Sequence, residues 1–424
     1  MNAGQRFVVT RFVAGAMTLT LRAFLLATVA ALCAGAGPFS TGTVAAQSHY
    51  DPGASDTEIR IGNVMPHTGA FAEYGVVADA EAAYFRMIND QGGINGRKIV
   101  YLSLDSQSNP QTGIELVHKL IEQDHVLLLV STFGTPVNIA IRPYMNSQRI
   151  PQLFVTSPAA IFDDPAHYPY TMGFEASRHT EALVYAKYIL RNKPDAKIGV
   201  LYGNDESGRE SVVGLREGLG DKAATMIVKE EMFSYGDAAS IGPHVAALKN
   251  AGADVFMNLL VGRYATEAIR QAYDMDWHPL QFLANASLSI SAFLDPAGAE
   301  KTNGIITNAR SKGWTTPGEQ KDPAVRAFLD WMKQYNPDAN LRDANNVYGY
   351  EVAQTLVEVL KKAGNDLTRE NVMKQAASLD FDLGMLRPGI RVTTSATDYR
   401  PIKQLYLIRF DGHNWVSIGN ISSE

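Results

Sequence analysis

Cysteine is almost absent from this chain of 424 residues, which contains only Cys33. This residue lies in a segment that reads as a cleaved leader, so the mature chain has no cysteine for disulfides, thiol catalysis or thiolate metal ligands. Basic side chains are also in the minority, with 38 Lys and Arg against 44 Asp and Glu. Proteins that bind nucleic acids concentrate Lys and Arg on one face, so this composition argues against a nucleic-acid partner.

Residues 1–46 predict a signal peptide, because they contain three arginines, no acidic residue and an apolar run over 23–37. Val44-Ala45-Ala46 then supplies small residues at a cleavage position. This order is typical of a secretory leader, and the apolar run is too short to span a membrane comfortably. Removing the leader lowers the formal net charge from −6 to −9.

The leader has three other interpretations. An uncleaved N-terminal anchor is the alternative to cleavage. A start at Met17 would give a leader of more ordinary length. The residues before Cys33, with Leu32 next to it, fit a lipoprotein cleavage motif poorly, so lipidation is rejected.

The mature part, about 378 residues, exceeds a comfortable single core and predicts two domains. Apolar residues recur at helical spacing from Ala80 to Ile88, and Gly92-Gly93 ends this helix. Asn95-Gly96 then forms a turn into the strand 99–104. Strands and helices keep alternating along the chain, so we expect an α/β fold with two parallel sheets covered by helices on both faces.

Several segments carry a resemblance to a known family. Gln-Gly-Gly-Ile-Asn-Gly-Arg-Lys over 91–98 is preceded by a strand over 58–65 with Thr68-Gly69 and Tyr74 after it. It is followed by the loop Ser-Thr-Phe-Gly-Thr-Pro over 131–136 and by Thr-Ser-Pro-Ala-Ala over 156–160. In order and spacing these segments resemble the leucine/isoleucine/valine-binding family of periplasmic solute-binding proteins, which serve ABC importers. The resemblance covers the chain from about residue 57 to its end.

The resemblance implies a type I periplasmic binding protein with two lobes and a three-stranded hinge, crossed near 173–176, 307–311 and 385–390. The N-terminal lobe would comprise 57–175 plus 311–387, and the C-terminal lobe 176–310 plus 388–424. It also implies a periplasmic monomer that closes on a small solute and docks on an ABC permease of the inner membrane. No cofactor and no metal are expected.

Ligands of open parallel sheets bind beyond the carboxyl ends of the strands. The resemblance places the ligand-binding residues in such loops, with Thr135 holding a carboxylate, Tyr74 packing on the ligand and the backbone of Ala159 near its head group. The full set of candidate ligand-binding residues is Tyr74, Phe133, Thr135, Ser157, Ala159, Ala160, Ser207, Gly262, Tyr264, Asn285 and Ser287.

The chain departs from the amino-acid-binding pattern in the second lobe. Ala286 stands where such proteins place an acid for the α-ammonium group, and Ser207 stands where they place an aromatic residue. A buried ammonium without a partner costs several kcal/mol. We therefore expect a carboxylate without an α-amino group, an aromatic or other organic acid, and the tail over 394–401 is similar to members that bind such acids. The alternative is an amino acid whose ammonium meets Glu175 or Asp205.

Arg178 and Arg263 are further candidates, because either could face the carboxylate of a ligand. An enzyme is the competing class. His179 and Glu181 do not form a metal-binding HExxH, and the chain has no Gly-x-Ser-x-Gly elbow. The glycines of 92–98 follow a helix and precede a strand, the reverse of a phosphate-binding loop. A third hypothesis is a ligand sensor with the same fold, which signals to a membrane receptor.

Overall fold

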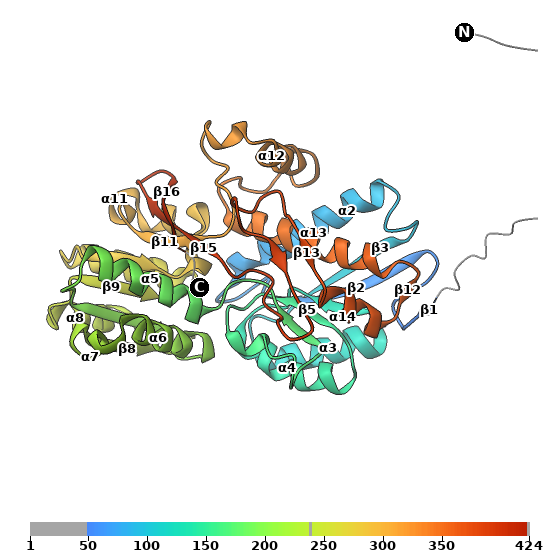
Figure 1. Cartoon of the computed structure of the whole chain (residues 1–424), viewed down its shortest axis with the longest axis horizontal. Helices are drawn as coiled ribbons and strands as arrows, with labels where there is room; N and C mark the ends of the chain where they lie inside the picture. The colour runs from blue at the N-terminus through green and yellow to red at the C-terminus, as the bar shows by residue number, and fades with distance from the viewer. Residues whose placement is uncertain (1–48, 237–239, 422–424) are drawn as a thin grey trace, which may run out of the picture. The chain divides into compact units, whose positions relative to one another are not determined.

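The computed structural model describes residues 49–236 and 240–421. The expected signal peptide and Cys33 lie outside these residues and stay predictions. Two sheets, each with its own helices, form two lobes of the described chain (Figure 1). Within the described residues, no helix combines the length and apolar character that crossing a membrane requires.

The first lobe has a five-stranded sheet in the order β3-β2-β4-β5-β6, and every pairing in it is parallel. Its strands are β2 Glu58–Met65, β3 Lys98–Asp105, β4 Leu128–Val130, β5 Gln152–Val155 and β6 Thr171–Gly173. Its helices are α2 Val76–Asp90, α3 Pro110–His118, α4 Thr135–Ser147, α12 Pro323–Tyr335, α13 Ala344–Ala363 and α14 Arg369–Ala376. Two short pairs complete it: β1 His49–Tyr50 with β12 Asp366–Leu367, and β13 Asp380–Phe381 with β14 Val392–Thr393.

The predicted turn between α2 and β3 is confirmed, and it depends on glycine. Gly92 and Gly93 have φ of 100° and 76°, a region that L-residues with a side chain rarely adopt. A Cβ on Gly93 would lie 2.1 Å from the carbonyl oxygen of Arg97. The tight return of the chain to β3 therefore requires a residue without a side chain at this position.

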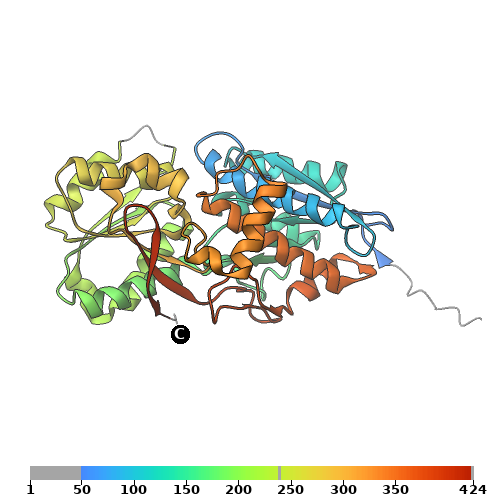
Figure 2. The ribbon, with the colours of Figure 1, turned by 90° about the horizontal axis from the view of Figure 1, so that it is seen from above.

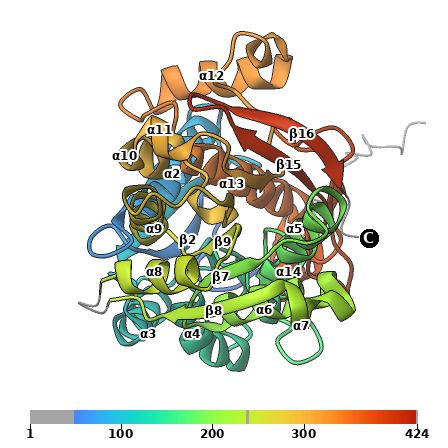
Figure 3. The ribbon, with the colours of Figure 1, turned by 90° about the vertical axis from the view of Figure 1, so that its left-hand side faces the viewer.

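The second lobe has a seven-stranded sheet in the order β16-β15-β11-β10-β9-β7-β8. Its strands are β7 Ile198–Gly203, β8 Ile227–Phe233, β9 Val255–Leu259, β10 Leu280–Leu283, β11 Ile306–Ala309, β15 Leu405–Phe410 and β16 Trp415–Ile421. The pairings from β8 to β11 are parallel, and the hairpin β15–β16 adds two antiparallel strands at the edge, as Figure 3 shows. Its helices are α5 Arg178–Asn192, α6 Glu206–Leu219, α7 Ala223–Met226, α8 Gly242–Asn250, α9 Arg263–Asp274, α10 Asp295–Ala297 and α11 Ala299–Thr302.

Short 3-10 and π turns lie in the loops between these elements. They are η1 Ala72–Gly75, η2 Lys119–Gln123, η3 Ala160–Phe162, η4 Gly220–Lys222, η5 Asn285–Ser287, η6 Ile290–Leu294 and η7 Glu319–Lys321. Three of them, η1, η3 and η5, follow strands β2, β5 and β10. These turns carry candidate ligand-binding residues to the edge of each sheet.

The chain passes between the lobes after β6, after β11 and before β15. The third passage differs from the prediction, which placed it near 385–390 and gave 388–424 to the second lobe. Ile390, Val392, Tyr399 and Ile402 pack in the hydrophobic core of the first lobe, and β14 pairs with β13. The segment up to residue 402 therefore lies with the first lobe, and the second lobe resumes at β15. Figure 2 shows the helices over 323–376 beside the N-terminal segments of the first lobe.

Candidate ligand-binding cleft

A cavity of about 420 Å³ lies between the two lobes. Residues from both lobes line it, and many of them stand in loops that follow the carboxyl ends of parallel strands. Phe71 follows β2, Phe133 follows β4 and Ser157 follows β5 in the first lobe, while Asp205 follows β7 and Ala286 follows β10 in the second. The position is the one at which open α/β sheets bind their ligands.

Six of the eleven candidate residues line the cavity: Tyr74, Phe133, Thr135, Ser157, Ser207 and Asn285. The other five, Ala159, Ala160, Gly262, Tyr264 and Ser287, do not line it. The Ser287 hydroxyl accepts a hydrogen bond from the Gly262 amide at 3.0 Å. Tyr264 packs on Phe71 with ring centroids 5.8 Å apart. Gly262, Tyr264 and Ser287 therefore support the wall in the described conformation and do not form its surface.

An aromatic wall, defined as Phe71, Tyr74, Phe133 and Tyr235, lines part of the cavity. The ring centroids of Tyr74 and Phe133 are 4.8 Å apart, and those of Phe71 and Tyr235 are 5.5 Å apart. The first three rings come from the first lobe and Tyr235 from the second. Burial raises the pKa of Tyr74, so its hydroxyl remains a neutral donor. It donates to the carbonyl oxygen of Ala286 at 2.9 Å.

Thr135 and Ser157 form a pair of hydroxyl groups beside this wall. Their oxygens are 2.8 Å apart, and Thr135 is only 5% exposed. Thr135 is the first residue of α4, and Gly134 before it has φ of 91°. Pro136 suits the first turn, where an amide hydrogen has no helical partner. Backbone amides at such a helix start have no partner within the helix and attract anions.

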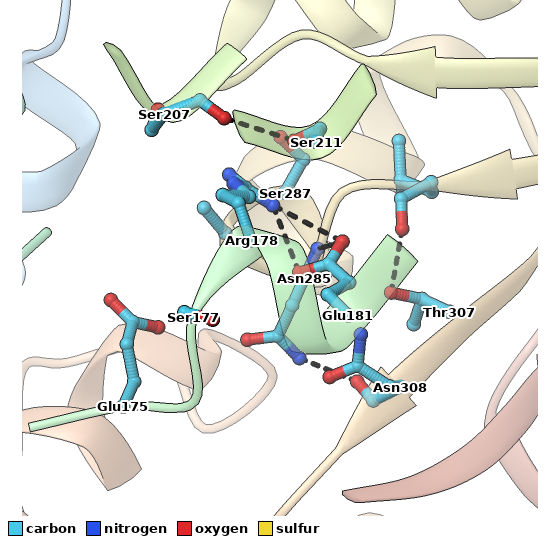
Figure 4. Close-up of polar contacts among 12 residues, drawn as sticks. Glu175, Ser177, Arg178, Glu181, Ser207, Ser211, Asn285, Ser287, Thr307 and Asn308 are labelled. Carbon is cyan, nitrogen blue, oxygen red and sulfur yellow. Dashed lines mark hydrogen bonds and ion pairs between the residues drawn. The ribbon is translucent and has the colours of Figure 1, made fainter. Parts of the chain in front are cut away.

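The floor of the cavity in the second lobe carries a buried ion pair, which Figure 4 shows. The Nη1 atom of Arg178 donates to both carboxylate oxygens of Glu181, at 3.1 and 3.0 Å. Both side chains are at most 4% exposed. Burial alone would lower the pKa of Arg178, but the carboxylates of Glu181 and Glu175 raise it. Glu181 also accepts from the backbone amide of Asn285 at 3.1 Å, so the pair fixes the η5 loop.

A second buried cluster lies where the chain passes between the lobes. Arg310 donates from Nε to Glu351 at 3.0 Å, and its Nη1 lies 3.9 Å from the carboxylate of Glu175. Burial raises the pKa of Glu175, although Arg310 and Arg178 act to lower it. The guanidinium of Arg310 lies over Tyr348, 4.7 Å from the ring centroid. Among these residues Glu175, Arg310 and Tyr348 line the cavity.

Sequence reasoning missed several lining residues. Tyr235 follows β8 and Arg310 follows β11. A search of the loops after the carboxyl end of every strand would therefore have found both residues. Phe71 lies three residues before Tyr74 in the same loop. Glu351 does not line the cavity but pairs with Arg310, and it had no local signal, because Arg310 is 41 residues away in the chain.

Hydrogen bonds join the two lobes across the cavity. The amide of Ala160 donates to Glu210 of α6 at 2.9 Å, and the amide of Arg178 donates to the carbonyl of Pro158 at 2.8 Å. Tyr74 and Ala286 supply a further contact, described above. The structure therefore shows the lobes in contact. Within residues 49–236 and 240–421, no group of three or more His, Cys, Asp and Glu residues could hold a metal ion.

Comparison with known proteins agrees with this architecture. A family model described as periplasmic binding protein matches residues 58–414. The Leu/Ile/Val-binding protein homolog 3 of Brucella melitensis is 25% identical over 323 residues, covering 74% of this chain and 81% of the relative.

Two solved structures show the same fold. A branched-chain amino acid ABC transporter protein of Thermus thermophilus with bound valine has a TM-score of 0.76 at 16% identity, covering 87% of this chain and 97% of that one. A solute-binding protein of an R. palustris ABC transporter, in complex with 4-hydroxybenzoate, has a TM-score of 0.73 at 15% identity, with coverage of 86% and 97%.

The chain belongs to the periplasmic binding protein family. Members of this family are transport components and not enzymes. The fold is that of a type I periplasmic binding protein. Family membership also implies that the protein works in the periplasm.

Proposed function

We propose that the protein captures a small carboxylate without an α-ammonium group, an aromatic or other organic acid, and delivers it to an ABC permease of the inner membrane. The observation that carries this proposal is the pair of hydroxyl groups, Thr135 at the start of α4 and Ser157 after β5, beside the aromatic wall. A carboxylate bound to Thr135, Ser157 and the nearby amides would place its apolar part against the rings of Tyr74 and Phe133.

The surroundings of Ala286 support the absence of an ammonium group. Ala286 lines the cavity, and its carbonyl oxygen is already bonded to Tyr74. Asp205 also lines the cavity, but its carboxylate accepts from the Gly208 amide at 2.8 Å and from the Ser207 hydroxyl at 3.0 Å. This carboxylate serves as the N-cap of α6. An ammonium placed beside Ala286 would have no side-chain acid from η5 to pair with.

The relative from R. palustris supports the same class of ligand, because it is in complex with 4-hydroxybenzoate. In this mechanism the first lobe binds the carboxylate, the second lobe closes over it, and the closed form docks on the permease. The protein acts as a monomer, after cleavage of the signal peptide. Affinity near 1 μM, equivalent to roughly −8 kcal/mol, would allow both capture and release.

A second candidate is an α-amino acid, and the charge count of the buried clusters favours it. Arg178 and Arg310 face three carboxylates, those of Glu175, Glu181 and Glu351, so one carboxylate is in excess. Glu175 lines the cavity and would meet the ammonium. The relative from T. thermophilus holds valine. We prefer the carboxylate, because the positive charges of Arg178 and Arg310 already act on Glu175.

A thermal-shift screen of residues 47–424 against aromatic acids, fatty acids, dicarboxylates and α-amino acids separates the two candidates. A ligand at about 100 times its dissociation constant adds about 2.7 kcal/mol to stability if it binds only the folded form. A rise in melting temperature with organic acids, and none with amino acids, supports a carboxylate ligand without an α-ammonium group. Shifts confined to α-amino acids establish the second candidate and overturn the first.

Calorimetry on Thr135→Val then tests the binding residue. The variant removes one hydrogen bond to a charged acceptor, so affinity for the best acid should fall by about 1–3 kcal/mol. Thr135→Ser keeps the hydroxyl and is the matched control, with affinity close to that of the unmodified protein. Equal affinity in all three proteins would exclude Thr135 from the site.

A further inference from the structure

The cavity continues past the aromatic wall to the passage between the lobes, where Arg310, Lys312 and Arg387 line it. Two short segments pair there in antiparallel fashion around Ser311 and Leu386. The amide of Arg387 donates to the carbonyl of Arg310 at 2.8 Å, and the amide of Lys312 donates to the carbonyl of Met385 at 2.7 Å. Arg310 and Arg387 are therefore neighbours on adjacent backbone segments.

The three cations differ in how their charge is balanced. Arg310 is paired with Glu351, and Lys312 is paired with Asp322 at 2.9 Å. No ion pair joins Arg387 to a carboxylate in the described part of the chain, and its Nε atom is buried without a hydrogen-bond partner. Its guanidinium lies 5.5 Å from the ring centroid of Tyr406. Arg387 thus lines the cavity with an unused buried donor.

The nearest candidate for a counter-charge is already engaged. Burial lowers the pKa of Arg387, and the carboxylate of Glu319 only partly offsets this effect. Glu319 accepts from the amide and the hydroxyl of Thr316, at 3.1 and 2.9 Å. A buried donor without an acceptor costs stability. An anion bound to Arg387 would pair with its charge and offer an acceptor to its guanidinium.

We propose that this end of the cavity is a second anion-binding subsite, and that the solute is an elongated diacid. One acidic group binds Thr135 and Ser157, and the other binds Arg387. This inference rests on the proposed function, since it assumes that the first group is a carboxylate. The size of the cavity agrees with it: a cavity of about 150 Å³ holds one benzene ring, whereas this one has about 420 Å³.

The test is calorimetry on the mature protein with matched mono- and dicarboxylates. The probes are a homologous series of α,ω-dicarboxylates with monocarboxylates of equal chain length, and terephthalate with benzoate as the aromatic pair. We expect the dicarboxylate of best length to bind at least about tenfold tighter than its monocarboxylate, because it gains a charge-assisted hydrogen bond.

The variant Arg387→Gln should remove this preference while leaving the affinity for the monocarboxylate within about twofold, which also shows that the variant is folded. Arg391→Gln is the control: it removes an exposed cation of the same segment that pairs with Asp380 and Asp382. It should keep the preference.

If monocarboxylates bind and no dicarboxylate binds more tightly than its matched monocarboxylate, the second subsite is overturned and the proposed function stands. A preference that survives in Arg387→Gln overturns the assignment to Arg387. If only α-amino acids bind, the proposed function fails, and the diacid fails with it.

Discussion

The hydroxyl group of Tyr74 gives the sharpest prediction, because it joins the lobes through a single bond. It donates to the carbonyl of Ala286 at 2.9 Å, whereas the ring packs on Phe133 and Phe293 at centroid distances of 4.8 and 5.5 Å. The substitution Tyr74→Phe keeps the ring contacts and removes only the bond across the cleft. The net value of such a bond is about 0.5–1.5 kcal/mol. The closed form should therefore lose about 2- to 13-fold in population relative to the open form.

When the open form predominates without ligand, the apparent affinity is proportional to the population of the closed form. The loss of closed form therefore raises the apparent dissociation constant by the same factor. Calorimetry with the best acid should show weaker binding for Tyr74→Phe by that factor. The control is Tyr84→Phe, which removes a hydroxyl in the core of the first lobe, away from the cavity. Its affinity should stay unchanged. Equal affinities for Tyr74→Phe and the unmodified protein would refute the view that this bond holds the lobes closed.

Two further predictions concern stability. Burial raises the pKa of Glu81 from 4.5 to about 8, so the folded protein keeps a proton that the unfolded chain releases. The stabilisation from this proton is complete below about pH 4.5. Between about pH 4.5 and pH 8 the free energy of unfolding falls by about 1.4 kcal/mol per pH unit. In Glu81→Gln, urea unfolding should show a pH-dependent fall in the free energy of unfolding that is smaller by a few kcal/mol. An unchanged dependence on pH would contradict a raised pKa of Glu81. Arg178→Met leaves Glu181 buried without its partner and should lower the free energy of unfolding by about 3–5 kcal/mol. Adding Glu181→Gln should restore part of this free energy. Unchanged stability of the single variant would contradict a buried ion pair.

The alternation of strands and helices was predictable because each element carries a local signal. The helix α2 shows its apolar period, and Gly92 and Gly93 mark its end. Loops after strands could also be located, so Tyr74, Thr135 and Ser157 were found at the cavity. These features depend on residues close in sequence.

The remaining features depend on contacts between distant segments. The strands β13 and β14 have two residues each, too few to show a period, so the segment over 390–402 was given to the wrong lobe. The pairing of Arg310 with Glu351 and the approach of Arg387 to Arg310 arise only when the chain has passed between the lobes. Sequence patterns do not reveal which polar side chains such passages bring into one cavity.

The central claim is that the cleft accepts a carboxylate and has no place for an α-ammonium group. Calorimetric titration of the mature protein with 3-phenylpropanoate and with phenylalanine tests it directly, because the two ligands share a carbon skeleton and differ in that group. We predict that 3-phenylpropanoate binds at least about tenfold tighter, since an unpaired buried ammonium costs several kcal/mol. Tighter binding of phenylalanine would contradict the account.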